Sequence, residues 1–159
     1  MEFNPEWAII GKVVLAMFLG GLVGAEREWA AKPAGLRTHM LVAGASTLFV
    51  VLGDIMIHQF AQMSITETIQ TDPIRIMEAI ITGISFLGAG TIIFKDQKHS
   101  VEGLTTAASI LFISGIGMAV ALSEYAMAVV LTLLVICILF GLGLIQNWIL
   151  AKQPDAKKS

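Results

Sequence analysis

Five long apolar runs, separated by short polar segments, set the strongest limit on how this chain can fold. About 20 apolar residues in a row are enough for a helix to cross the roughly 30 Å hydrocarbon core of a bilayer. Inside lipid a backbone must satisfy its own hydrogen bonds, so the runs predict the all-α class. The composition agrees, because only 14% of the residues are charged, against about 25% in a typical soluble domain. We therefore predict a polytopic membrane protein with five transmembrane helices.

Helix breakers and caps set the expected boundaries. Pro33 and Gly35 turn the chain after the first run, and Asp72 with Pro73 is typical of a helix start. We expect one membrane domain over residues 1–150 and a polar tail over residues 151–159. The expected helices are Trp7–Ala25, Thr38–Phe60, Pro73–Phe94, Leu104–Leu122 and Tyr125–Leu150, with charged loops at 26–37 and 95–103.

The distribution of positive charge predicts the orientation. With five spans, all but two of the ten lysines and arginines fall in the first loop, the third loop and the tail. The two exceptions are Lys12 and Arg75. Because cytoplasmic loops are enriched in Lys and Arg, we expect the N-terminus outside and the C-terminus in the cytoplasm.

The segment from Gly24 to His39 places five charged residues between two apolar runs. Glu26 and Arg27 follow a glycine-rich apolar helix with no polar spacer, and charges this close to hydrocarbon need partners. We predict a cytoplasmic charge network of Glu26, Arg27 and Arg37 that shapes a vestibule or docks a partner. The alternative is that these charges only anchor the helices at the interface and fix the topology.

Two carboxylates are expected in the outer half of the membrane. Asp54 interrupts the second apolar run near its far end, and Glu78 lies near the start of the third. Ionisable groups at such depths usually have a function, and Mg²⁺ is bound by one or two carboxylates that leave it several waters. We therefore predict a cation site of Asp54 and Glu78. The alternative is purely structural pairing, Asp54 with Lys12 and Glu78 with Arg75.

Glycines cluster in the first and third runs. Spacings such as G-xxx-G allow close approach of two helix backbones, so we assign these glycines to helix packing. Five helices are few for a monomeric transporter, so we expect a homodimer, with the glycine face of the first or third helix as its contact. The alternative is a ligand path, with backbone carbonyls freed by local unwinding. The glycines assigned to packing are Gly20, Gly24, Gly83, Gly88 and Gly90.

Three sequence strings resemble the N-terminal membrane domain of the MgtC/SapB family. The first joins Gly24–Glu28 to Gly35–His39, the second is Gly83–Gly90 and the third is Gly103–Ala108. Ser85 stands where the family often has glycine. Thr105 and Phe112 stand where some virulence-linked members have Asn and Cys. Longer members carry a soluble cytoplasmic domain after the fifth helix, and we expect this chain to carry the membrane domain alone.

The resemblance implies a protein of the bacterial inner membrane that is linked to magnesium limitation, acid stress or survival inside hosts. Both ion transport and regulation of other membrane proteins have been proposed for the family. The first hypothesis is thus a protein of magnesium homeostasis or stress adaptation that binds or moves a cation. The alternative is a non-transporting regulator that binds another membrane protein through its helix faces.

Other classes of function find little support in the sequence. No spacing typical of a catalytic triad, a zinc protease or a phosphate loop is present, so we expect no enzyme and no cofactor other than Mg²⁺. No basic run is dense enough for nucleic acid. A single cysteine, Cys137, excludes an intrachain disulfide. The expected partners are the lipid bilayer, a second copy and another membrane protein.

Overall fold

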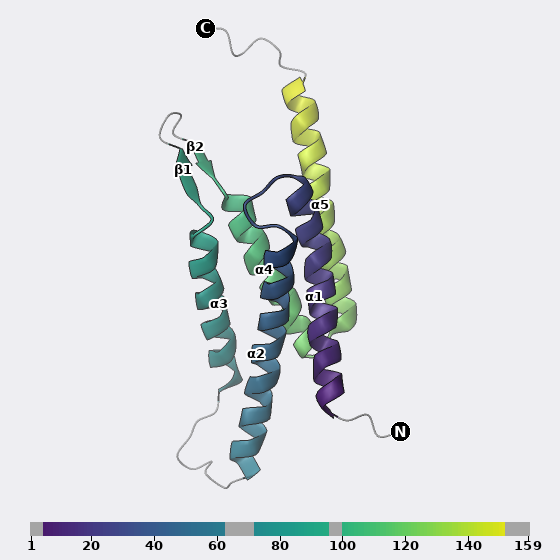
Figure 1. Ribbon diagram of the computed structural model, residues 1–159, viewed down its shortest axis with the longest axis vertical. Coiled ribbons are helices and arrows are strands. Elements are labelled where there is room, and N and C mark those ends of the chain that lie inside the picture. The colour runs from purple at the N-terminus through teal and green to yellow at the C-terminus, as the bar shows by residue number, and fades with distance from the viewer. Residues whose placement is uncertain (1–4, 63–71, 96–99, 152–159) are drawn as a thin grey trace.

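The chain forms a bundle of five helices and one short β-hairpin (Figure 1). This computed structural model describes residues 5–62, 72–95 and 100–151. It confirms the all-α class, because the hairpin adds only two three-residue strands. The helices are α1 (Pro5–Trp29), α2 (Leu36–Gln62), α3 (Pro73–Ala89), α4 (Leu104–Ala121) and α5 (Tyr125–Ala151), and the strands are β1 (Ile93–Lys95) and β2 (Ser100–Glu102).

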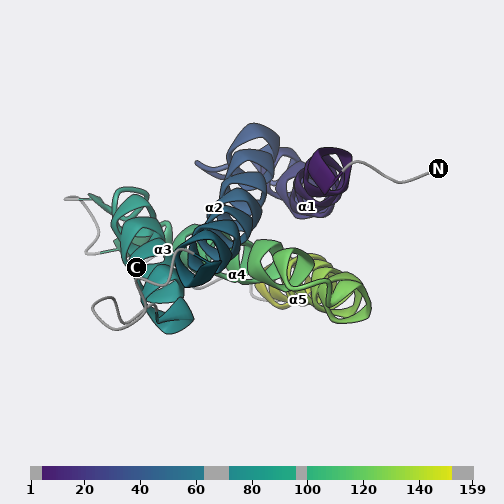
Figure 2. The ribbon, with the colours of Figure 1, turned by 90° about the horizontal axis from the view of Figure 1, so that it is seen from below.

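Helix α4 lies at the centre of the bundle and contacts α1, α2, α3 and α5 (Figure 2). Apolar side chains lie on its buried face and also on its exposed face, where Leu104, Leu111 and Phe112 stand, as expected of a helix that packs on its neighbours and crosses a membrane. Three isoleucines of α4, Ile110, Ile113 and Ile116, are fully buried and form the middle of the core. Ala16 and Val23 of α1 and Ala43 of α2 pack into the same cluster.

The up-and-down arrangement gives the bundle two distinct ends (Figure 1). The hairpin end holds the α1–α2 turn (residues 30–35), the β1–β2 hairpin and the end of α5. The opposite end holds the start of α1, the end of α2, the start of α3 and the α4–α5 turn (residues 122–124). We call it the pocket end, because a pocket lined by Lys12, Asp54 and His58 lies there. The segments that carry most of the basic residues in the described sequence therefore share the hairpin end.

The described helices are those of a membrane protein. Three are long and apolar enough to cross a bilayer: Glu6–Trp29, Leu36–Phe60 and Leu104–Ala121. Helix α5 has 27 residues and includes the apolar stretch Tyr125–Gly141, and α3 has only 17 residues. Large apolar side chains are exposed on the outer faces, which suits contact with lipid. The five-span count itself stays a prediction.

The first helix ends later than predicted. It continues past Ala25 through Glu26, Arg27 and Glu28 to Trp29, so the predicted loop at 26–37 is shorter. The charges do not break the helix, since helix-breaking residues come only at Pro33 and Gly35. The turn is closed by the Glu28 carboxylate, whose Oε2 accepts a hydrogen bond of 2.9 Å from the backbone N–H of Leu36 at the start of α2.

The third helix ends earlier than predicted. It stops at Ala89 instead of Phe94, and part of the predicted loop at 95–103 is a β-strand. Thr91 helps to end it, because its hydroxyl donates to the Gly88 carbonyl at 2.7 Å. The apolar residues beyond then pair across an antiparallel hairpin, with Ile93 opposite Glu102. An apolar run this short fits a strand as well as a helix.

Candidate functional site: a buried charge pair and a polar pocket

The predicted charge network lies at the hairpin end, and two of its three members form a pair. Nη2 of Arg27 donates to Oε1 of Glu26 at 2.6 Å, and Nε of Arg27 contacts Oε2 of the same carboxylate. The side chains are only 5% and 13% exposed, respectively. A two-point contact between a guanidinium and a carboxylate is a strong, charge-assisted interaction. Arg37, on the first turn of α2, is exposed, and in the described part of the chain no ion pair joins it to Glu26.

A buried histidine continues the polar cluster at this end. His39 of α2 is fully buried, with Nδ1 2.9 Å from the Gly35 carbonyl oxygen and Nε2 3.0 Å from Oγ of Ser109 in α4. A carbonyl oxygen only accepts, so Nδ1–H donates to Gly35, and Nε2 lies against the Ser109 hydroxyl. That hydroxyl also lies 2.8 Å from the Thr106 carbonyl oxygen. His39 thus ties α2 to α4.

A polar pocket of about 440 Å³ occupies the opposite end of the bundle. Asp54 and His58 line it from α2, and Oδ1 of Asp54 lies 3.5 Å from Nε2 of His58. Both side chains remain about 70% exposed, so water reaches them. The other lining residues are Lys12, Val50, Val51, Ile57, Pro73, Ile76, Met77, Ala121, Leu122 and Ser123.

Only one of the two predicted carboxylates, Asp54, lines this pocket. Glu78 is exposed on α3 and does not line the pocket that holds Asp54. Neither structural pairing forms among the described residues, since no ion pair joins Asp54 to Lys12 or Glu78 to Arg75. The Lys12 ammonium instead donates to the Ala121 carbonyl oxygen at 2.8 Å. Within the described ranges, no group of three or more His, Cys, Asp or Glu side chains comes together to hold a metal ion.

The glycines of α1 face α2. A methyl group added at Gly20 would lie 2.5 Å from the His39 carbonyl oxygen and 2.9 Å from Cβ of Ala43. One added at Gly24 would lie 2.7 Å from Cα of Leu36. These two glycines therefore let the backbones of α1 and α2 touch, and this face of α1 is used inside the chain.

The glycines of α3 have looser surroundings. A methyl group at Gly83 would meet nothing within 4 Å, and one at Gly88 would make ordinary contact, 3.4 Å from Cβ of Ala107 in α4. Gly90 follows the end of the helix, where its N–H bonds back to the Phe86 carbonyl at 3.1 Å. Of the predicted packing glycines, Gly88 is thus the one that α3 places against a neighbouring helix.

The fold and its polar regions define a helical membrane protein. A largely buried Glu26–Arg27 pair lies at one end, and the exposed Asp54 and His58 lie at the other. Comparison with known families places it further: the model of the MgtC family matches residues 13–148. The chain belongs to the MgtC family, and the resemblance found in the three sequence strings is confirmed.

Individual relatives agree with this assignment. An uncharacterized protein of Haemophilus influenzae is 38% identical over 152 residues, which are 95% of this chain and 63% of that protein. The Escherichia coli protein named "Putative magnesium transporter YhiD" is 37% identical over 79% of this chain and 57% of its own length. Protein MgtC of Salmonella typhimurium is 37% identical over 79% of this chain and 48% of its own length.

These relatives are longer than the chain, which covers about half to two thirds of each. No solved structure matches it.

Proposed function

We propose that this protein acts in magnesium homeostasis or stress adaptation in the bacterial inner membrane, and that it binds a divalent cation at the pocket end. Membership of the MgtC family supports the link to magnesium, as does the name of the E. coli relative. The apolar helices support the membrane location. The observation that carries the cation site is the position of Asp54, an exposed carboxylate in a polar pocket at the edge of an apolar bundle.

The chemistry of the pocket suits a hydrated cation. Mg²⁺ keeps several of its waters and needs only one or two carboxylates, so Asp54 can serve without Glu78 in direct contact. Lys12 is the group that opposes a cation there. Its ammonium is drawn towards the Ala121 carbonyl, which leaves the Asp54 carboxylate with His58 as its only ionic partner among the described residues.

The orientation that we propose turns this pocket outward. The hairpin end holds the basic residues of the α1–α2 turn and of the β-hairpin, so the positive-inside rule favours it as the cytoplasmic side. The N-terminus and the pocket then face the outside of the cell, where the protein meets external Mg²⁺. In this proposal all five helices cross the membrane and two copies form a homodimer. Crosslinking in membranes that yields only monomer would remove the dimer.

A titration of thermal stability with MgCl₂ tests the cation site. A ligand that binds only the folded state at ten times its Kd stabilises that state by about 1.4 kcal/mol. We expect MgCl₂ to raise the Tm of the wild type and not that of Asp54→Asn, whereas KCl at equal ionic strength raises neither. An equal rise in Tm for the variant and the wild type would contradict a cation site at Asp54.

A non-transporting regulator is the second candidate, and the core of the bundle favours it. Between the two polar ends, α4 fills the centre with the fully buried Ile110, Ile113 and Ile116, and the pocket does not reach Glu26 or Arg27. Magnesium flux into proteoliposomes with a trapped indicator separates the candidates. Flux that Asp54→Asn abolishes would establish transport, while no flux from folded protein supports the regulator.

A further inference from the structure

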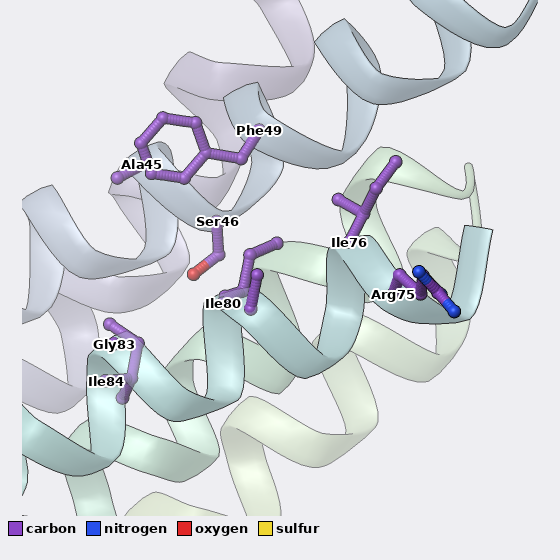
Figure 3. Close-up of a pocket in the computed structure, with 9 residues that line it drawn as sticks. Ala45, Ser46, Phe49, Arg75, Ile76, Ile80, Gly83 and Ile84 are labelled. Atoms are coloured by element: carbon purple, nitrogen blue, oxygen red, sulfur yellow. The ribbon is translucent and has the colours of Figure 1, made fainter. Parts of the chain in front are cut away.

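A groove of about 530 Å³ runs between α2 and α3 and is not part of the polar pocket (Figure 3). Its volume is within the range of small-molecule sites, roughly 300–1,000 Å³. Almost all of its surface is apolar, and one side is open. There is open space at Gly83, where an added methyl group would meet nothing within 4 Å. The groove is lined by Ala45, Ser46, Phe49, Arg75, Ile76, Ala79, Ile80, Gly83 and Ile84.

One polar side chain forms the floor of this groove. Ser46 is 1% exposed, and its hydroxyl is the one buried side-chain polar group in the described part of the chain without a hydrogen-bond partner. Its neighbour Thr47 donates to the Ala43 carbonyl at 3.0 Å and to the Gly117 carbonyl at 2.7 Å. A buried hydroxyl without a partner is destabilising, and the Ser46 oxygen points towards α3 across the groove (Figure 3). The floor therefore offers a donor that the protein itself does not use.

Arg75 borders one end of the same groove, with its guanidinium pointing away from Ser46 (Figure 3). Arg75 is in the first turn of α3 and is exposed. Within the described residues it forms no ion pair. Its guanidinium therefore remains available for a two-point contact with a phosphate. From Arg75 to the level of Ile80 and Gly83, beside Ser46 in Figure 3, α3 rises by about 8–12 Å.

We propose that the groove binds one anionic phospholipid molecule. Its phosphate contacts Arg75, an ester carbonyl accepts from the Ser46 hydroxyl, and an acyl chain lies along Phe49 and the isoleucines of α3. A helix of another protein fits these features less well. It offers no phosphate for a two-point contact with the Arg75 guanidinium. The proposal is independent of any cation at Asp54.

Native mass spectrometry of the full chain in detergent tests the proposal. Phosphatidylglycerol and phosphatidylcholine with identical acyl chains are added in turn, and the bound lipid is counted. A basic residue near the surface of an anionic membrane contributes about 1 kcal/mol. We therefore expect the wild type to prefer phosphatidylglycerol about fivefold and Arg75→Gln to lose that preference. Arg37→Gln is the matched control, because Arg37 is also an exposed arginine in a first helical turn, and it should keep the preference.

A second pair of variants tests the groove itself. Gly83→Leu fills it and should abolish binding of both lipids, whereas Gly11→Leu, at another open glycine, should not. If Gly83→Leu fails to fold, the Arg75 and Arg37 variants decide alone. Equal binding of the two lipids by the wild type would overturn the proposal. A photoreactive residue placed at position 49 gives a second test. Crosslinks from it to a second copy or to another protein, instead of to lipid, would also overturn the proposal.

Discussion

The two ends of the bundle treat charge in opposite ways. At the hairpin end Glu26 and Arg27 are 13% and 5% exposed and hold each other by two contacts. At the pocket end Asp54 and His58 are 70% and 74% exposed and lie 3.5 Å apart. A buried pair is satisfied inside the protein and is sensitive to loss of one partner. An exposed pair contributes little to stability and remains free to exchange its partner for a solute.

This difference indicates that the charges at the hairpin end stabilise the fold, whereas those at the pocket end are available to bind a ligand. The sequence string around Glu26 is the part of the family resemblance richest in charge, yet two of its charges, Glu26 and Arg27, are turned inward and paired with each other. In the pocket at the other end, the side chains of Asp54 and His58 are exposed to water. We therefore expect substitutions at the hairpin end to change the stability of the fold, and substitutions at the pocket end to change the response to cations.

The largest effect is expected from Glu26→Ala. The substitution leaves the buried Arg27 guanidinium without its carboxylate, and breaking a buried pair in this way destabilises by about 3–5 kcal/mol. Reversible unfolding of the purified protein in mixed micelles measures the loss. Arg37→Gln removes an exposed charge from the same end and should change the free energy of unfolding by less than about 0.5 kcal/mol. Equal effects of the two variants would show that the pair is not buried as described.

The next effect is that of Gly20→Ala. The new methyl group would lie 2.5 Å from the backbone of α2, and overpacking of this kind typically destabilises by about 1–3 kcal/mol. Gly11→Ala is the matched control, since nothing lies within 4 Å of its added methyl group. There the gain in helix propensity should leave stability unchanged or slightly higher. A Gly20→Ala protein as stable as the control would contradict the close contact of α1 and α2.

A smaller loss is expected from Ser109→Ala. This change removes the partner of His39 Nε2, and hydrogen bonds between membrane helices contribute about 0.6 kcal/mol on average. Thr132→Val is the control, because the Thr132 hydroxyl bonds only within its own helix, to the Ala128 carbonyl at 2.8 Å. If Ser109→Ala, Thr132→Val and the wild type all unfold at the same denaturant concentration, the hydrogen bond between His39 and Ser109 does not stabilise the fold.

The smallest change in basal stability is expected from Asp54→Asn. Its side chain is exposed and pairs only weakly with His58, so without Mg²⁺ the free energy of unfolding should move by no more than about 0.5 kcal/mol. A loss as large as that of Glu26→Ala would place Asp54 among the structural charges and remove the contrast between the two ends. Glu78→Gln, outside the pocket, should be equally mild and should keep the response to Mg²⁺.

Hydropathy was sufficient to predict the helices, because each apolar run is long and bounded by clear breakers. It misplaced the end of α3, since residues Ile92–Phe94 are as apolar as the helix before them, and only the pairing of Ile93 with Glu102 shows that they have left it. Hydropathy also predicted too early an end for α1, because Glu26 and Arg27 are charged and therefore resemble loop residues. A hydropathy scale contains no information on their pairing within the helix.

The polar sites were harder to predict than the helices. His39 and Ser109 are 70 positions apart, and no spacing rule joins them; only the packing of α2 on α4 brings them together. Asp54 was predicted from its depth in an apolar run. Its neighbour in the pocket is His58, one turn further along the same helix, which the i and i+4 spacing alone could have indicated. The distance between Asp54 and Glu78 depends on how α3 packs, which hydropathy does not contain.

The most direct test of a cation site at Asp54 is a count of bound Mn²⁺ by electron paramagnetic resonance. Mn²⁺ prefers the same carboxylate and water ligands as Mg²⁺, and its free signal falls when it binds. The purified wild type should bind one Mn²⁺ per chain, excess MgCl₂ should release it, and Asp54→Asn should bind none. If Asp54→Asn binds as much Mn²⁺ as the wild type, or if MgCl₂ releases none, the account of the pocket end is wrong.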